Sequence, residues 1–319
     1  MISQEFVNKI FNQEKKFVSR AITLVESGSD SATELLKAIH KNTGKAYRIG
    51  ITGPPGAGKS TLTNQLTKFY RKQNKTVGII AVDPTSPFTG GALLGDRVRM
   101  SEIGVDPGVF IRSMATRGSL GGLSKKTIDA ADILDAAGYD YIILETVGVG
   151  QSELDIANTT DSTIVVLVPE SGDSIQAMKA GLMEIADFFV LNKSDRPGSE
   201  SAIMALRTIL MMRDHTENDW LPNIIKAIAS ENFGIQEIAD EIERHKTFLE
   251  QNQMLVKKRA EHFRIRIKEI VELKIKENLW RGDRSMWLNN SLKKVVDGEE
   301  SPYQIADLLL SNVIFNSTK

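Results

Sequence analysis

The run Gly53-Pro54-Pro55-Gly56-Ala57-Gly58-Lys59-Ser60, followed by Thr61, combines the residue types that bind phosphate. It matches G-x-x-x-x-G-K-[ST] and lies between an expected strand, Tyr47–Thr52, and an expected helix, Ser60–Lys72. The glycines let successive backbone N–H groups converge on phosphate oxygens, and the helix N-terminus favours an anion at the same place. Lys59 would reach the β- and γ-phosphates, and the Ser60 hydroxyl would bind Mg²⁺. The pattern predicts the fold of a P-loop nucleoside triphosphatase.

A second motif, Asn192-Lys193-Ser194-Asp195, follows an expected strand at Asp187–Leu191. The pattern N-K-x-D in this position is typical of guanine recognition. Asp195 can accept hydrogen bonds from guanine N1–H and from the 2-amino group, whereas adenine offers neither donor there. A site that requires such a partner discriminates strongly against a base that lacks it. Asn192 would brace the phosphate loop or contact the base edge, and the Lys193 stem would cover the ring. The motif favours GTP over ATP.

A third motif, Glu145-Thr146-Val147-Gly148, ends the apolar run Tyr141–Leu144. An acid at the end of a buried strand is suited to a Mg²⁺-bound water, and the Gly148 N–H can reach the γ-phosphate. Ras-type GTPases have Asp where this chain has Glu145, and they carry a water-positioning Gln directly after the glycine. Here Val149 takes that place and Gln151 follows two residues later. We therefore expect slow intrinsic hydrolysis that a partner accelerates.

Two further loops follow expected strands. The segment 83–96 begins and ends with carboxylates, Asp83 and Asp96, and oxygen ligands of this kind suit Mg²⁺. We expect Asp83 at a strand end, with Asp96 brought in by the loop, to sense the metal and the γ-phosphate. The segment Pro169–Gln176 would lie near the nucleotide, but its residues alone favour an exposed loop that caps a helix.

The elements that position these motifs alternate regularly. Seven short, continuously apolar runs are separated by helical stretches, which predicts a doubly wound, mostly parallel α/β sheet. The expected strands are Tyr47–Thr52, Thr76–Asp83, Val109–Ser113, Tyr141–Thr146, Thr163–Val168, Asp187–Leu191 and Ile224–Ala229. The residues before Thr43 read as helical, with a break at Gly28. After His245 the strands stop, and a long helical stripe follows at Met254–Trp280.

Composition excludes several classes of protein. The chain has 319 residues, a formal net charge of −1 and no cysteine. Balanced charge gives no general electrostatic reason to expect nucleic acid or membrane partners, and the lack of cysteine excludes disulfides and thiolate metal sites. The stretch from Arg244 to Arg284 is locally basic, which favours a solvated helix face, with a docking surface for an acidic partner as the alternative. No secretory signal and no run of 18 apolar residues is present, so we expect a cytoplasmic protein.

Several motifs together resemble the MeaB/ArgK family of GTPases, from about residue 17 to the C-terminus. They are Arg20–Glu26, the phosphate loop, Val82–Gly91, Gly95-Asp96-Arg97 and Glu145–Glu153. Members of this family are G-protein chaperones of adenosylcobalamin-dependent methylmalonyl-CoA mutase, which guard cofactor loading and protect the mutase from inactivation. The resemblance implies an N-terminal helical extension (1–45), a P-loop GTPase domain (46–245) and a C-terminal helical arm (246–319) that forms a homodimer.

The resemblance also implies roles for particular residues. Ser60, Asp83, Asp96 and Glu145 would surround Mg²⁺. The segment 172–179 becomes a third switch that communicates with the mutase. Ile228-Ala229 stands where G proteins often have Ser-Ala, so the Ala229 N–H would contact guanine O6. The expected nucleotide-binding residues are Gly53, Gly56, Ala57, Gly58, Lys59, Ser60, Thr61, Asn192, Lys193, Asp195 and Ala229. The expected catalytic residues are Lys59, Glu145, Gly148 and Gln151.

Three alternatives compete with a GTPase chaperone. A small-molecule or protein kinase of the amino-acid transport type needs an acceptor pocket and a base, which no motif singles out. A nickel-type metallochaperone GTPase would use Cys and His ligands, whereas this chain has four scattered histidines. They are His40, His215, His245 and His262. A non-enzymatic scaffold is disfavoured because the motif residues are intact.

Overall fold

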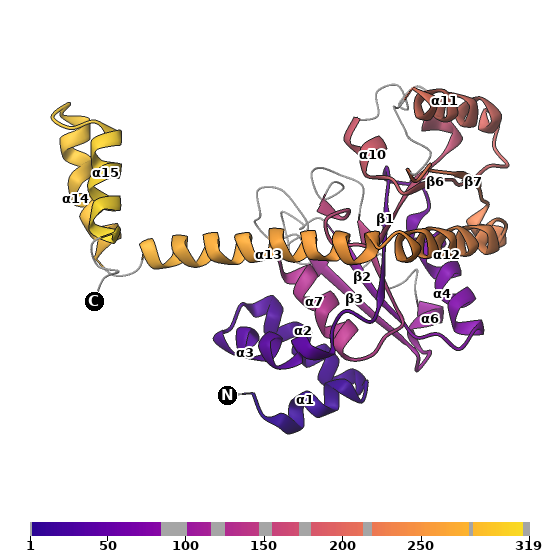
Figure 1. Ribbon diagram of the computed structural model, residues 1–319, viewed down its shortest axis with the longest axis horizontal. Helices are drawn as coiled ribbons and strands as arrows, with labels where there is room; N and C mark the ends of the chain where they lie inside the picture. Colours follow the sequence, from indigo (N-terminus) through magenta and orange to yellow (C-terminus); the bar gives the residue numbers. More distant parts are fainter. Residues whose placement is uncertain are drawn as a thin grey trace. The chain divides into compact units, whose positions relative to one another are not determined.

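The computed structural model describes residues 2–83, 101–115, 125–146, 155–171, 180–212, 219–280 and 283–314. The chain divides into two compact units, Met1–Val256 and Lys257–Lys319. The first unit holds the sheet and every described residue of the motifs above (Figure 1). The second unit is helical.

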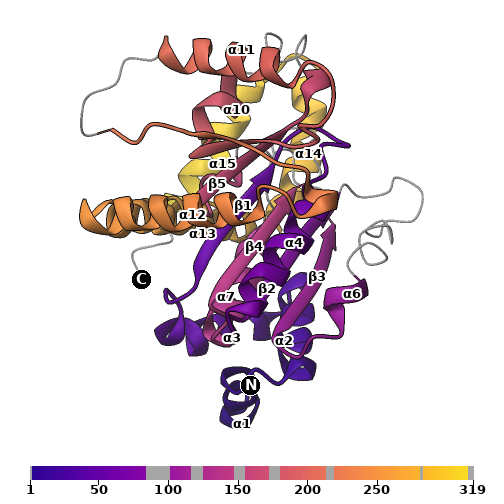
Figure 2. The same cartoon turned by 90° about the vertical axis from the view of Figure 1, so that its right-hand side faces the viewer.

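Seven parallel strands form one sheet in the order β3-β2-β4-β1-β5-β6-β7 (Figure 2). This arrangement confirms the predicted doubly wound α/β class. The strands are β1 (Tyr47–Thr52), β2 (Val77–Asp83), β3 (Val109–Ala115), β4 (Tyr141–Thr146), β5 (Ser162–Leu167), β6 (Phe188–Leu191) and β7 (Ile224–Lys226). Strands β4, β5 and β6 are buried along their whole length, which explains their unbroken apolar runs.

Helices cover both faces of the sheet (Figure 1). One face packs against α4 (Lys59–Lys72), α6 (Ser101–Gly104) and α12 (Ile235–Gln251). The other face packs against the N-terminal helices and α7 (Lys125–Ala136), and beside β5 and β6 against α10 (Ala180–Ile185) and α11 (Ser199–Met211). The carboxyl ends of the parallel strands therefore meet at one edge, where a doubly wound sheet binds its ligand.

The N-terminal residues form three helices and a short 3-10 turn. They are α1 (Gln4–Phe11), α2 (Lys15–Ser27), α3 (Asp30–Ile39) and η1 (His40–Asn42). The stretch that we expected to be helical up to Gly28 is interrupted, because Gln13 adopts a left-handed conformation with φ of 56°. The turn brings Phe6 and Phe17 edge to face, with ring centroids 5.7 Å apart.

A buried carboxylate anchors the entry into β1. Asp135 of α7 accepts hydrogen bonds from the backbone N–H groups of Gly44, Lys45 and Ala46 at 2.8–3.0 Å. The Arg48 guanidinium bonds to Asp135 at 3.1 Å and to Asp132 at 2.7 Å. These contacts compensate the cost of burying the carboxylate and fix the segment between the N-terminal helices and the sheet.

Strand β7 is shorter than the predicted run Ile224–Ala229. After Lys226 the chain leaves the sheet and enters a 3-10 turn, η3 (Ala229–Glu231). The Ala227 carbonyl accepts a hydrogen bond from the Ser194 N–H at 3.1 Å, so the chain is drawn toward the turn that follows β6. The apolar residues 227–229 are buried or half-buried there without being strand.

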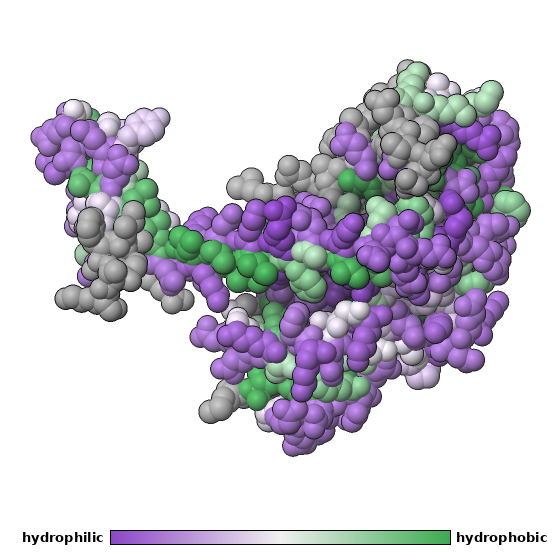
Figure 3. Space-filling model, viewed as in Figure 1, coloured by the Kyte–Doolittle hydropathy of each residue, from purple (hydrophilic) through white to green (hydrophobic). Residues whose placement is uncertain are grey.

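The long helix predicted after Met254 is present as α13 (Met254–Leu279), which crosses the boundary between the two units. None of its described residues is buried. Apolar side chains nevertheless follow one stripe along it, including Phe263, Ile267 and Val271 (Figure 3). The second unit continues with α14 (Arg284–Val296) and α15 (Pro302–Ile314). Among the helices of the described residues, none combines the length and apolar composition needed to cross a membrane.

Candidate functional site

The phosphate loop lies between the end of β1 and the start of α4. Gly53 has φ of 132°, and a Cβ atom there would lie 2.1 Å from the Val166 carbonyl oxygen of β5. Gly58 has φ of 89°, and its Cβ would lie 2.3 Å from the Asn192 side-chain nitrogen. Only glycine fits both positions, because each combines a left-handed backbone with a neighbour inside contact distance.

The Lys59 side chain folds back over this loop. Its ammonium donates hydrogen bonds to the carbonyl oxygens of Gly53, at 2.7 Å, and Pro54, at 2.9 Å. Lys59 is the first residue of α4 and is 6% exposed. The cation is thus already held among the loop's backbone atoms at a helix N-terminus, which is the arrangement that attracts phosphate oxygens.

The N-K-x-D turn is hydrogen-bonded directly to the phosphate loop. Asn192 follows β6, and its side-chain nitrogen donates to the Ala57 carbonyl at 2.8 Å, across 135 residues of sequence. The Lys193 ammonium donates to the Gly56 carbonyl at 2.8 Å. The two motifs, far apart in the sequence, therefore lie side by side at the carboxyl ends of β1 and β6.

Asn192 also joins a third segment to the site. Its side-chain oxygen accepts the backbone N–H of Ala229 at 3.0 Å. Asn192 and Ala229 are both buried, at 3% and 1% exposure. The N–H that the resemblance assigns to guanine O6 is thus engaged by Asn192 in this structure. Asp195 lies in the same turn with its side chain exposed, and Thr61 is exposed on the first turn of α4.

Glu145 is the last residue but one of β4 and pairs with Ile51 of β1, and its side chain accepts hydrogen bonds from two hydroxyls of α4. The Ser60 hydroxyl lies 2.5 Å from Oε1, and the Thr63 hydroxyl lies 2.9 Å from Oε2. Glu145 is only 5% exposed, so these bonds compensate the burial of its charge. Thr63 was not among the predicted site residues, although its position three residues after Ser60 places both on one helix face.

This set of oxygen donors suits Mg²⁺. A serine hydroxyl and a carboxylate converge beside the phosphate loop, and Mg²⁺ takes such oxygens together with phosphate and water. Asp83 ends β2, and its backbone pairs in register with Ala115 of β3. Its side chain, together with Asp96, Gly148, Gln151 and the segment 172–179, lies outside the described residues. Within the described part of the chain, no group of three or more His, Cys, Asp or Glu side chains could hold a metal by itself.

An exposed ion pair links the N-K-x-D turn to the next loop. The Arg196 guanidinium lies 2.5 Å from the Glu170 carboxylate in η2 (Pro169–Ser171). The hydrogen bond from Arg196 holds the pKa of Glu170 below its ordinary value. The ion pair therefore connects η2 to the turn that carries Asp195.

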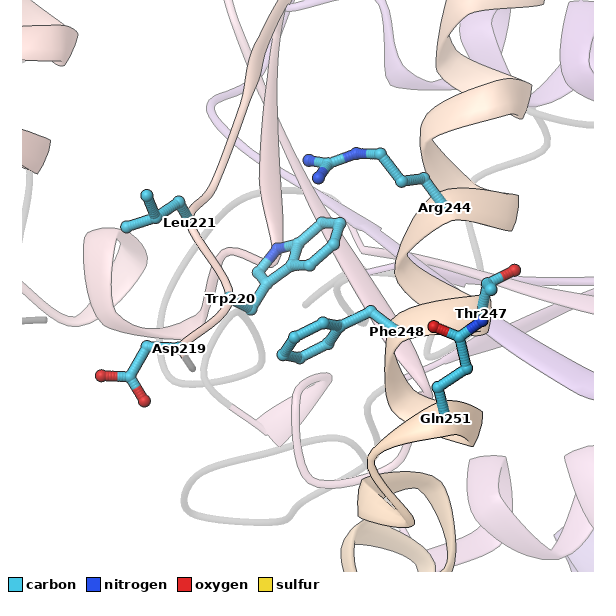
Figure 4. Close-up of a pocket in the computed structure, with 7 residues that line it drawn as sticks. All are labelled: Asp219, Trp220, Leu221, Arg244, Thr247, Phe248 and Gln251. Carbon is cyan, nitrogen blue, oxygen red and sulfur yellow. The ribbon is translucent and has the colours of Figure 1, made fainter. Parts of the chain in front are cut away.

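A separate hollow of about 450 Å³ lies between α12 and the segment before β7 (Figure 4). The Trp220 ring lies between two other lining side chains, with the Arg244 guanidinium 4.0 Å from its centroid and the Phe248 ring centroid at 5.2 Å (Figure 4). The indole N–H donates to the Asp187 carbonyl at 2.5 Å. Among the described residues, the side chains that line the hollow include no member of the three motifs, so we treat it as separate from the nucleotide site.

Comparisons with known proteins show which proteins this chain is similar to in sequence and fold. A family model described as methylmalonyl Co-A mutase-associated GTPase MeaB matches residues 18–284. A Pyrococcus abyssi protein that is named as a GTPase is 46% identical over 316 residues, covering 97% of this chain and 96% of that protein. The mouse methylmalonic aciduria type A homolog, a mitochondrial protein, is 33% identical over 332 residues, covering 96% and 79%. The crystal structure of a protein named LAO/AO transport system kinase has a TM-score of 0.72 and 28% identity, covering 98% and 99%.

Proposed function

This chain belongs to the MeaB family of GTPases, and from that premise we propose that it is a chaperone of an adenosylcobalamin-dependent methylmalonyl-CoA mutase. Its reaction is the hydrolysis of GTP to GDP and phosphate. In the proposal, the bound nucleotide sets the affinity for the mutase, and the chaperone gates cofactor loading and protects the mutase from inactivation. A cytoplasmic location is part of the same proposal.

The observation that carries the nucleotide assignment is the direct bonding of two motifs. Asn192 and Lys193 donate to the carbonyls of Ala57 and Gly56, so the turn bearing Asp195 is fixed at one distance from the phosphate loop. A guanine nucleotide spans such a gap, with its phosphates at the loop and its base at Asp195. The Asp195 carboxylate would accept hydrogen bonds from the N1–H and the 2-amino group of guanine. Adenine has neither donor at these positions, so it would leave the carboxylate without a partner.

The residues around Glu145 fit a Mg²⁺ ion. Ser60 and Glu145 would hold it, with Asp83 and Asp96 contributing from β2 and the loop that follows. When bound, the ion would neutralise charge that develops on the β- and γ-phosphate oxygens. Lys59 would exchange the carbonyls of Gly53 and Pro54 for phosphate oxygens. The chain has no glutamine directly after Gly148, so slow intrinsic turnover stays a prediction, with Gln151 or a partner supplying the missing group.

Nucleotide state would reach the mutase through the segments that touch the γ-phosphate. We place the switches at 83–96, 148–153 and 172–179. Binding of the γ-phosphate would favour one ordered arrangement of these segments, and hydrolysis would release it. The proposed homodimer uses the C-terminal helices, because the exposed apolar stripe of α13 would be buried against a second copy.

Calorimetric titration tests both halves of the proposal. The protein is titrated with GDP, a non-hydrolysable GTP analogue and ADP in Mg²⁺, and then with a purified methylmalonyl-CoA mutase in each nucleotide state. We expect guanine nucleotides to bind, ADP to fail, and mutase affinity to differ between the two guanine states. Lys59→Ala is the matched control, because it should remove nucleotide binding and with it any nucleotide effect on the mutase. Equal mutase affinity in all states would contradict the chaperone proposal.

The kinase alternative rests on the likeness to the protein named LAO/AO transport system kinase, at 28% identity. A kinase would transfer the γ-phosphate to an acceptor, and it would need a base to take the acceptor's proton. Turnover of ATP that depends on an added amino acid, with no turnover of GTP, would favour that function. The bonded N-K-x-D turn leads us to expect the opposite result.

A further inference from the structure

We propose that Thr63 is a positioning residue that locks the Glu145 carboxylate in the orientation that receives Mg²⁺. The inference rests on the Mg²⁺–GTP site proposed above and adds to it a residue outside the phosphate-loop motif. It concerns the affinity of the site for the metal, and it assigns Thr63 no contact with the nucleotide.

Each oxygen of the Glu145 carboxylate accepts a hydrogen bond from a different hydroxyl of α4. Ser60 bonds to Oε1 at 2.5 Å, and Thr63 bonds to Oε2 at 2.9 Å. Thr63 is fully buried, and Glu145 is 5% exposed, so water has little access to this oxygen. Because Ser60 is itself a predicted metal ligand, Thr63 is the hydroxyl that can hold the carboxylate while Ser60 turns toward the ion.

A glutamate needs a hydrogen bond that fixes its carboxylate more than an aspartate does. Its side chain has one more rotatable bond than that of aspartate, so more orientations must be given up when the carboxylate is fixed. Thr63 is itself well fixed, because it is fully buried and β-branched on a helix, where few side-chain rotamers are allowed. The Thr63 hydroxyl on α4 therefore fixes the orientation of the more flexible Glu145 side chain on β4.

Loss of the hydroxyl should therefore affect metal binding selectively. Oε2 would lose this donor in a buried place, and the carboxylate would reach orientations that face away from the ion. The described contacts of Thr63 do not include the loop backbone that binds phosphate, so nucleotide affinity in the absence of metal should change little.

The test compares Thr63→Val, which keeps the shape and removes the hydroxyl, with Thr63→Ser, which keeps the hydroxyl. Fluorescent GDP binding is measured in EDTA and over a Mg²⁺ titration. For Thr63→Val we expect unchanged affinity in EDTA and a half-maximal Mg²⁺ concentration raised roughly tenfold, the loss of one hydrogen bond to a charged group. Thr63→Ser should restore the wild-type Mg²⁺ dependence. Thr67→Val is the matched control, since it removes a buried hydroxyl from the same helix that bonds to backbone only.

The outcomes separate this inference from the site on which it rests. If wild-type protein binds GDP equally with and without Mg²⁺, the proposed metal site is wrong and the inference falls with it. If Mg²⁺ matters but Thr63→Val has wild-type Mg²⁺ dependence, only the role of Thr63 is wrong. If Thr63→Val lowers GDP affinity equally in EDTA and in Mg²⁺, the substitution has a general packing effect and the role of Thr63 is wrong. The same conclusion follows if Thr63→Val and Thr67→Val change the Mg²⁺ dependence equally. Thr63→Ala provides the same deletion if the valine variant does not fold.

Discussion

Replacing Gly58 by alanine should break the connection between the phosphate loop and the N-K-x-D turn. The added Cβ would lie 2.3 Å from the Asn192 side-chain nitrogen, which bonds to the Ala57 carbonyl at 2.8 Å. The amide must move away, and in a side chain that is 3% exposed it loses that bond, at a cost of about 1–3 kcal/mol. The left-handed φ of 89° adds about 1–2 kcal/mol for any residue with a Cβ.

Gly56 offers a matched control within the same loop. Its φ is 77°, and a Cβ there would meet nothing within 4 Å. Gly56→Ala should therefore lower the free energy of unfolding only by the cost of placing a residue with a Cβ at a left-handed φ, about 1–2 kcal/mol. Urea unfolding without nucleotide should place Gly58→Ala about 1–3 kcal/mol below Gly56→Ala in free energy of unfolding. Nucleotide affinity should fall further in Gly58→Ala for the same reason.

A double-mutant cycle with Asn192→Ala isolates the clash. With the amide removed, Gly58→Ala should destabilise no more than Gly56→Ala does in wild-type protein. The two substitutions should then be non-additive by about 1–3 kcal/mol. Additivity within about 0.5 kcal/mol, or equal free energies of unfolding for the two glycine variants, would refute the reasoning.

Three other substitutions test separate parts of the structure. Asp195→Ala should weaken GTP binding roughly 10- to 100-fold in calorimetry, since only guanine offers this carboxylate its donors; unchanged GTP affinity in the variant would contradict the base assignment. Asp106→Asn should lower stability at neutral pH but not in acid. The hydrogen bond from Arg71 lowers the pKa of Asp106 from 3.8, so its contribution is present above that value and is lost as the pH falls through the lower folded pKa; unfolding free energies of variant and wild type measured against pH should converge below 3.8. Arg48→Met should cost about 3–5 kcal/mol in thermal or urea unfolding, because the buried Asp135 carboxylate loses its cation; a change below about 1 kcal/mol would mean that the three backbone donors suffice.

The strands were predictable because they are buried on both faces of the sheet. The limits of β1 and β4 agree residue for residue with the apolar runs Tyr47–Thr52 and Tyr141–Thr146. The ends of these runs are marked in the sequence, because Gly53 follows the first run directly and Gly148 follows the second after one residue. The order of the strands is not contained in these runs, because crossovers of the same hand are compatible with several orders.

Other features depend on contacts that no local pattern contains. Residues 227–229 are apolar like a strand, but beyond the Ala227 N–H, which bonds to Leu191 of β6, their backbone bonds to Ser194 and Asn192 instead of to a strand. The break at Gln13 was missed because a left-handed residue other than glycine leaves no mark in composition. Thr63 was missed because it lies outside the phosphate-loop motif, and only the fold brings Glu145 opposite to its hydroxyl.

The N-terminal helices form one side of the core of the nucleotide-binding unit. Ile10, Ile22 and Leu35 share a continuous apolar cluster with Ile80 of β2 and Leu144 of β4, next to Glu145. A chain shortened to begin at residue 46 would expose that face of the sheet to water and would remove the backbone donors of Gly44 and Lys45 from Asp135. Attempts to express a minimal catalytic fragment of this protein should therefore keep the first 45 residues.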